Sequence, residues 1–140
     1  MANDKKVYRA GTIPYIVEDG IIKMMFMRPS DPEYGGDKFQ IAKGKVEDGE
    51  STMDAALREA KEELGLFIGN VIATEEVGVF MGRTTVYAAK VKDRNMFGEP
   101  SFETSDTAWL SLTEFADIGR ELHYHVVQAA HRMIENSEKL

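Results

Sequence analysis

The sequence predicts an α/β fold, in which a mixed α+β arrangement places helices on both faces of one mixed sheet. Three observations carry this prediction. Strand-like segments open the chain, an amphipathic helix is inserted before further strands, and a second amphipathic helix ends the chain. This order is typical of a sheet covered by helices on both sides. With no internal repeat or linker, residues 1–140 are expected to form a single domain.

The first elements are expected to form a β-hairpin followed by a loop. Residues 7–17 and 21–28 are rich in apolar and β-branched side chains, and a Glu-Asp-Gly turn at 18–20 joins them. Residues 29–38 contain two prolines and two glycines, which indicates a loop. The short run FQIA at 39–42 is predicted to be a third strand.

A helix is expected to begin after Ser51, which is a good N-cap residue. Asp54 stands three positions later, where a capping-box partner belongs. Gly65 stands at the C′ position, where a left-handed residue ends many helices. The helix is therefore predicted to lie between Ser51 and Gly65.

The second half of the chain is expected to add strands and one more helix. Residues 70–81 and 84–92 predict two strands joined by a short glycine-containing turn. A second loop is expected at 94–106 and a last short strand at 107–112. The periodicity around residues 121–136 predicts a terminal helix of about 15 residues.

Composition excludes several classes of partner. The net charge of −7 leaves no basic stripe for long nucleic acid, so none is expected as a partner. No apolar run is long enough to cross a bilayer, so no membrane partner is expected. The absence of cysteine excludes disulfides and thiolate sites, and the chain is expected to be cytoplasmic. A small anionic ligand remains compatible with this charge if Mg²⁺ offsets it.

The predicted helix separates an apolar face from a carboxylate face. At 3.6 residues per turn, one stripe faces the core; it consists of Met53, Ala56, Leu57, Ala60 and Leu64. Glu59, Glu62 and Glu63 share another arc, because they are spaced i, i+3 and i, i+4. On a solvated surface these carboxylates would repel each other, and the last helical turn disfavours negative charge. A divalent cation would remove both penalties, so the cluster is either a solvated face or a cation site.

The residues around this cluster follow a fixed pattern, G-x5-E-x7-R-E-U-x-E-E-x-G-U, where U is apolar. The matching positions are Gly44, Glu50, Arg58, Glu59, Ala60, Glu62, Glu63, Gly65 and Leu66. This pattern resembles the Nudix box without a substitution. The expected order of strands and helices also resembles the Nudix fold, an α/β/α sandwich, over most of the chain.

The resemblance implies a pyrophosphohydrolase. Nudix enzymes hydrolyse a diphosphate linkage in a nucleoside diphosphate joined to another group, and they use Mg²⁺ or Mn²⁺. Carried over to this sequence, Glu59, Glu62 and Glu63 are the expected metal ligands. Arg58 belongs to the expected catalytic set through an indirect role, in which it pairs with Glu50 and orients the carboxylates. Glycines near the box would let the chain approach the metals closely.

Further positions of the box have supporting roles by the same resemblance. Gly44 is expected to let the loop turn beside the metals, and Gly65 to end the helix. Two candidates remain for the base that takes the proton from the attacking water. One is a glutamate of the helix, such as Glu59 or Glu62. The other lies in the loop before Trp109, which resembles the acidic loop of many family members and indicates Glu103 and, less strongly, Asp106.

The substrate is expected to be a small nucleotide derivative. The stretch around Lys43 and Lys45 resembles the dinucleoside polyphosphate hydrolase and RNA pyrophosphohydrolase branch, in which these lysines would contact phosphates. Tyr87 is a candidate to contact a base, although it falls later than the tyrosine of some family members. Dinucleoside polyphosphates are the first expectation. The alternatives are an RNA 5′ end, an ADP-ribose- or NAD-type compound, and a non-catalytic nucleotide-binding module; the oligomeric state is left open.

Overall fold

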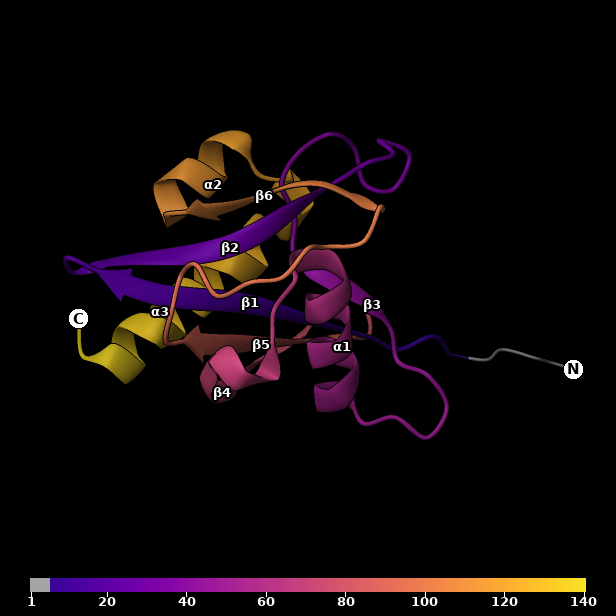
Figure 1. The fold of residues 1–140 in the computed structure, drawn as a ribbon, viewed down its shortest axis with the longest axis horizontal. Helices are drawn as coiled ribbons and strands as arrows, with labels where there is room; N and C mark the ends of the chain where they lie inside the picture. The colour runs from indigo at the N-terminus through magenta and orange to yellow at the C-terminus, as the bar shows by residue number, and fades with distance from the viewer. Residues whose placement is uncertain (1–5) are drawn as a thin grey trace, which may run out of the picture.

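A single six-stranded mixed sheet organises the chain. A computed structural model describes residues 6–140 (Figure 1). Five strands follow the order β4-β5-β1-β2-β6, and β3 pairs with β1 outside this path. The strands are β1 (Arg9–Glu18), β2 (Ile21–Pro29), β3 (Ala42–Lys45), β4 (Val71–Phe80), β5 (Thr84–Val91) and β6 (Thr104–Leu110). The pairing of β1 with β5 is parallel and the other pairings are antiparallel, so the mixed sheet is confirmed.

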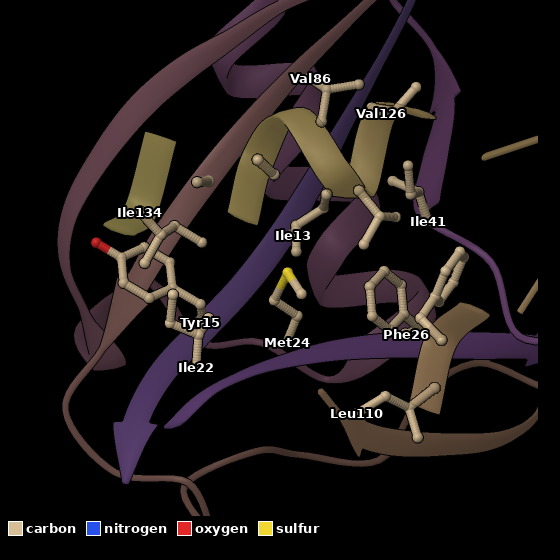
Figure 2. Packing of buried hydrophobic residues seen from close by; sticks show 14 of the residues in the cluster. Ile13, Tyr15, Ile22, Met24, Phe26, Ile41, Val86, Leu110, Val126 and Ile134 are labelled. Carbon is tan, nitrogen blue, oxygen red and sulfur yellow. The ribbon is translucent and has the colours of Figure 1, made fainter. Parts of the chain in front are cut away.

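The β1–β2 hairpin forms the centre of the sheet and is buried on both faces. Side chains alternate across a strand: Met24 and Phe26 enter the large core cluster, whereas Met25 and Met27 enter the smaller cluster on the opposite face. Figure 2 shows Met24 and Phe26 within the large cluster, beside Ile13 of β1. Burial on both faces accounts for the nearly continuous apolar run in this strand.

Three α-helices cover the two faces of the sheet. Helix α1 (Thr52–Leu64) packs on the face with the smaller clusters. Helices α2 (Leu112–Ile118) and α3 (Tyr124–Glu138) supply side chains to the large cluster on the other face. Single 3₁₀ turns precede β4 at Ile68–Asn70 and α3 at Glu121–His123. The predicted three-layer α/β/α arrangement is therefore confirmed.

Both predicted ends of α1 are present. The Ser51 hydroxyl accepts a hydrogen bond from the backbone N–H of Asp54 at 3.0 Å, which is one of the two bonds of a capping box. Gly65 adopts the left-handed conformation with φ 77°, and its N–H donates to the carbonyl of Lys61 at 3.0 Å. The predicted apolar stripe is buried at Ala56, Ala60 and Leu64, half-buried at Met53 and Leu57, and extended by buried Ala55.

Two expectations about the other elements were wrong. The strand expected at 39–42 is displaced, because residues 39 and 40 form single bridges to Gly119 and Met27 and the ladder with β1 starts at Ala42. The strand expected at 107–112 instead spans 104–110. Ser111 then caps α2 in a complete capping box with Glu114, a helix that the sequence interpretation missed.

The loop between β5 and β6 is attached to the C-terminal end of α1. The backbone N–H of Ser101 donates to the carbonyl of Glu62 at 2.7 Å, and the Thr104 hydroxyl donates to the carbonyl of Glu63 at 2.9 Å. The N–H of Gly98 donates to the carbonyl of Gly65 at 2.7 Å. These bonds satisfy carbonyls that a helix end leaves unpaired, and they fix the loop against the helix.

Among residues 6–140, no helix is both long and apolar enough to cross a membrane.

Gly65→Ala should destabilise the protein and loosen this loop. A β-carbon at Gly65 would overlap the backbone of Gly98 and would place alanine at a positive φ. We expect the free energy of unfolding to fall by about 1–3 kcal/mol in chemical denaturation. Gly69→Ala is the matched control, because a β-carbon there meets no atom within 4 Å. Equal stability of the two variants would contradict this account of Gly65.

Candidate functional site

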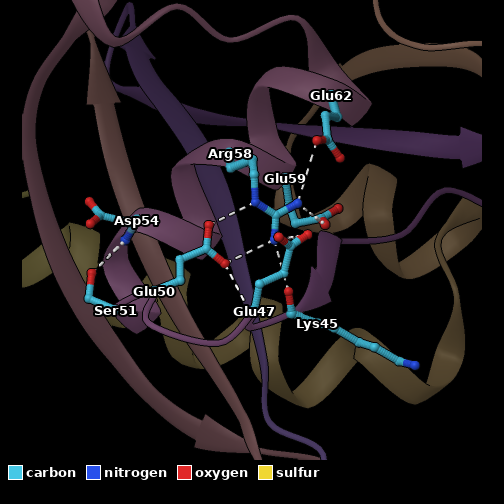
Figure 3. Close-up of polar contacts among 8 residues, drawn as sticks. All are labelled: Lys45, Glu47, Glu50, Ser51, Asp54, Arg58, Glu59 and Glu62. Carbon is cyan, nitrogen blue, oxygen red and sulfur yellow. Dashed lines mark hydrogen bonds and ion pairs between the residues drawn. The ribbon is translucent and has the colours of Figure 1, made fainter.

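A single guanidinium, that of Arg58 on α1, connects the loop before the helix to the carboxylates on it (Figure 3). Its Nε donates to Glu50 Oε2 at 2.8 Å and its Nη2 donates to Glu50 Oε1 at 3.1 Å. Nη2 also donates to the backbone carbonyl of Lys45 at 2.9 Å. Nη1 donates to Glu59 Oε1 at 2.9 Å and to Glu62 Oε1 at 3.4 Å. Arg58 therefore hydrogen-bonds three carboxylates and one carbonyl, and it also forms an ion pair with Glu47 at 3.7 Å.

The bidentate contact keeps the Arg58–Glu50 pair charged. Hydrogen bonds from Arg58 lower the pKa of Glu50 to about 2, helped by the bond from the backbone N–H of Glu47. The hydrogen bond to Glu50 likewise raises the pKa of Arg58. The backbone N–H of Glu47 donates to Glu50 Oε1 at 3.0 Å, so the loop folds around the Glu50 carboxylate. The predicted pairing of Arg58 with Glu50 is present.

Glu59 and Glu63 form a close carboxylate pair beside β3. The two carboxylates lie close enough to influence each other's protonation, and the backbone of Lys43 lies beside Glu63. Burial raises the pKa of Glu63, and the neighbouring Glu59 carboxylate raises it further, to about 9. A β-carbon on Gly44 would overlap the Glu59 carboxylate. Gly44 lies within the β1–β3 ladder and not in a turn. A glycine is required at this position because a side chain would occupy the space of the Glu59 carboxylate.

The donor set has the chemistry of a divalent-cation site, although its third member points elsewhere. Two adjacent, half-buried carboxylates in a chain without cysteine favour a hard cation such as Mg²⁺. The side chain of Glu62 is 51% exposed and turned toward Arg58. Within residues 6–140, no three acidic or histidine side chains converge closely enough to hold a cation as they stand. Glu62 would have to rotate away from Arg58 to join Glu59 and Glu63.

A cavity of about 590 Å³ opens beside this pair. It lies between the ends of β2 and β3, the loop that joins these two strands, and the loop between β5 and β6. It is lined by Arg9, Met27, Pro29, Ser30, Asp31, Tyr34, Gly35, Gln40, Ile41, Lys43, Glu63, Phe102, Glu103 and Arg120. Its volume is within the range of ligand pockets. One carboxylate of the pair, Glu63, therefore faces a space of ligand size.

The structure brings Glu103, but not Asp106, to this cavity. Glu103 is exposed and lines the cavity with Glu63. Its backbone carbonyl accepts from the N–H of Ser30 at 2.8 Å, which joins the two loops. Asp106 instead lies on β6, where it forms an ion pair with Arg28 at 3.3 Å. Of the two loop carboxylates singled out in the sequence, only Glu103 is within the same cavity as the box.

The three expected substrate contacts have different surroundings. The Lys43 side chain lines the cavity, and burial, with the positive charges of Arg120 and Arg9, lowers its pKa. Lys45 is exposed and its side chain does not line the cavity; its backbone carbonyl instead binds Arg58. Tyr87 does not fit the expected role. Its ring is 7% exposed under α1, and its hydroxyl lies 2.6 Å from that of Thr52, so it has no free face for a base.

Several cavity residues were missed by the sequence interpretation. Arg9 and Arg120 come from the start of β1 and from the segment after α2, and no local pattern relates them. Tyr34 and Phe102 are 76% and 89% exposed on the two loops. Aromatic residues in polar, glycine- or proline-containing loops are a usable signal for a binding surface. That signal was present in the sequence at both positions.

Glu63→Gln should stabilise the cation-free protein at alkaline pH. Because Glu63 has a raised pKa in the folded chain, its contribution to stability is complete below its ordinary pKa of 4.5 and is lost as pH rises toward about 9. Glutamine mimics the protonated form, so at pH 8 it should raise the free energy of unfolding by on the order of 1 kcal/mol or more. The gain should shrink as pH falls. Glu76→Gln, at an exposed position of β4, is the control; a gain independent of pH would contradict this origin.

Comparison with known proteins identifies the family. A model of the NUDIX domain matches residues 12–130. An Ap4A hydrolase of C. elegans, solved as a binary complex, superposes with a TM-score of 0.75 at 20% sequence identity, covering 94% of this chain and 99% of that one. RenU, a Nudix hydrolase of M. smegmatis, gives 0.72 at 17% identity, with 91% and 86% covered.

A third similar structure is the NUDIX domain of Shewanella oneidensis NrtR complexed with ADP ribose. Its TM-score is 0.71 at 11% identity, with 94% of this chain and 90% of that chain covered. At such identities the structural likeness shows the shared Nudix fold, and the domain match over most of the chain shows the family. The protein therefore belongs to the Nudix hydrolase family, whose enzymes cleave phosphorus-containing acid anhydrides.

Proposed function

We propose that this protein is a Mg²⁺-dependent pyrophosphohydrolase of dinucleoside polyphosphates, with Mn²⁺ as a substitute cation. The observation that carries the proposal is one cavity that combines Glu63 of the carboxylate pair, the loop carboxylate Glu103 and cationic side chains. A diphosphate needs positive charge around its oxygens and a base near the attacking water. These groups meet both requirements within one space of ligand size.

Glu59 and Glu63 are the proposed core of the cation site, and Glu62 completes it after rotating from Arg58. A bound divalent cation supplies positive charge to the diphosphate and makes water more acidic. Arg58 keeps Glu59 in place by a 2.9 Å hydrogen bond while its contact with Glu62, at 3.4 Å, is longer. The longer contact is the one that we expect to break.

The proposed reaction consumes one water per bond cleaved. The water oxygen bonds to one phosphorus as the bond from that phosphorus to the bridging oxygen breaks. The departing phosphate group keeps the bridging oxygen. We assign Glu103 as the base that takes the proton of the water. Among the described residues its carboxylate makes no ion pair, whereas that of Asp106 is engaged by Arg28. Its exposed position on a loop allows it to approach a bound substrate.

Dinucleoside polyphosphates are the proposed substrate class for two reasons. The similar C. elegans protein is an Ap4A hydrolase, and the superposition covers nearly all of both chains. The cavity is also lined by several cationic side chains, which suit a chain of phosphates. ADP-ribose is the second candidate, because the similar NrtR domain was solved with that compound.

The proposed activity is tested by product analysis on a nucleotide panel with Mg²⁺. The panel contains diadenosine tetraphosphate, ADP-ribose, NAD and a 5′-triphosphate RNA. We expect cleavage of diadenosine tetraphosphate with the highest kcat/KM. Glu62→Gln should lower kcat by about 10²-fold or more, because the cation loses a charged ligand, whereas the exposed control Glu76→Gln should not. Binding without cleavage of any compound would instead favour a non-catalytic module.

Glu103→Gln should remove the acidic limb of the pH–rate profile. A general base must be unprotonated, so the wild-type rate should fall as pH drops through the pKa of that base. Replacement with glutamine should lower kcat by roughly 10²- to 10⁴-fold and leave the residual rate flat in this range. Asp106→Asn is the matched loss of a carboxylate outside the cavity. An unchanged profile in Glu103→Gln would return the role of base to a glutamate of α1.

A further inference from the structure

The cavity lining carries three carboxylates, those of Asp31, Glu63 and Glu103, and an equal number of cationic side chains. The cationic residues are Arg9, Lys43 and Arg120, in a chain with a net charge of −7. In the part of the chain that the structure describes, none of the three forms an ion pair. Unpaired cations gathered in a partly buried space repel each other, and a bound anion would remove this repulsion.

Arg120 is held in a defined orientation. Its Nη1 donates to Gln40 Oε1 at 3.1 Å, and Gln40 Nε2 donates to the carbonyl of Tyr34 at 3.1 Å. The backbone N–H of Arg120 donates to the carbonyl of Phe39 at 2.7 Å. Gln40 is only 7% exposed, so the side chain that holds the guanidinium is itself fixed. Only one of five guanidinium N–H groups is used by Gln40, which leaves donors for a ligand.

Among residues 6–140, the side chain packed behind the Arg120 guanidinium does not offset its charge. His123 is fully buried, and its Nδ1 accepts from the N–H of Ile41 at 3.1 Å while Nε2 lies 3.4 Å from Arg120. Burial, together with the charges of Arg120 and Lys43, lowers the pKa of His123 to about 3, so the imidazole is neutral. The residues behind the guanidinium therefore fix its position without supplying a counterion.

The charges follow an order within the cavity. Arg120 is hydrogen-bonded to Phe39 and Gln40, at the start of the segment that leads into β3. Gly44, near the other end of this segment, lies against the Glu59 carboxylate. Lys43 therefore follows the Arg120 contacts along the segment and stands next to the carboxylate pair. A linear chain of phosphates that starts at the carboxylate-bound cation would pass Lys43 before it reaches Arg120.

We propose that Arg120, positioned by Gln40, binds a substrate phosphate outside the diphosphate that is cleaved. The site therefore prefers substrates with at least three consecutive phosphates over those with only two, such as ADP-ribose. A planar guanidinium suits this role, because it can donate two parallel hydrogen bonds to one phosphate. The inference rests on the proposed function for its substrate, but the binding of phosphates can be measured without turnover.

The first experiment measures binding of inorganic tripolyphosphate by titration calorimetry in buffer containing EDTA. We expect Arg120→Gln to raise the Kd about tenfold or more, since a charge-assisted contact is lost. Arg132→Gln removes the same charge from an exposed position of α3 outside the cavity and should leave the Kd unchanged. Arg120→Lys should lie between the wild type and Arg120→Gln. Equal Kd values for wild type and Arg120→Gln, or no binding to wild type, would overturn the proposal.

The second experiment compares two substrates with Mg²⁺ present. The ratio of kcat/KM for diadenosine tetraphosphate to that for ADP-ribose should fall about tenfold in Arg120→Gln. Gln40→Ala should lower the ratio less, mainly through the KM for diadenosine tetraphosphate, as a positioning role requires. The ratio should be unchanged in Arg132→Gln. Equal losses of kcat/KM on both substrates in Arg120→Gln would overturn the proposal. Inactivity of the wild type on every compound would count against the proposed function, and the calorimetry alone would then decide whether Arg120 binds a phosphate.

Discussion

The bidentate hydrogen bonds between Arg58 and Glu50 are the constraint on which the arrangement of the site depends. They connect the loop after β3 to α1, and the same guanidinium continues to Glu59 and to the carbonyl of Lys45. Without this positive charge, the clustered carboxylates would only repel one another. Lysine could not replace it, because a single ammonium group lacks the planar fork that contacts both oxygens of Glu50. The charge of Arg58 thus offsets part of the repulsion within the neighbouring carboxylate pair in this acidic chain.

The other half of the site is attached to the same helix through its backbone. The last carbonyls of α1 accept hydrogen bonds from Ser101 and Thr104, and the carbonyl of Gly65 after the helix accepts one from Gly98, so the loop that presents Glu103 is fixed by the helix end. The close approach depends on Gly65, whose left-handed conformation ends the helix against that loop. The helix that carries the proposed cation ligands therefore also determines where the second carboxylate segment lies. The site depends on few contacts because one helix organises both sides of it.

Local signals predicted much of this arrangement from sequence. The ends of α1 and its apolar stripe lie within a short span, where spacing translates directly into geometry. The contact of Arg58 with Glu50 was expected from the resemblance of this span to the Nudix box. Helix α2 was missed although Ser111 and Glu114 have the spacing of a capping box, because the short apolar run before it was extended as a strand.

Long-range contacts were not predictable in this way. Arg9 and Arg120 meet in the cavity only because the order of strands brings them together, and no local pattern encodes that order. Tyr87 was misread for a related reason: an aromatic residue in a strand does not reveal whether its face lies under a helix or toward a ligand.

The most direct test of the proposed cation site is the protonation of the carboxylate pair. Calorimetric titration of Mn²⁺ at pH 7, repeated in buffers of different ionisation enthalpy, measures the number of protons released per ion bound. We expect nearly one proton, because the raised pKa of Glu63 keeps this side chain protonated before the ion enters. The release should disappear in Glu63→Gln. Binding with the same release in Glu63→Gln would contradict the assignment of Glu63 to the cation site, and binding without proton release would contradict its protonation before the ion enters.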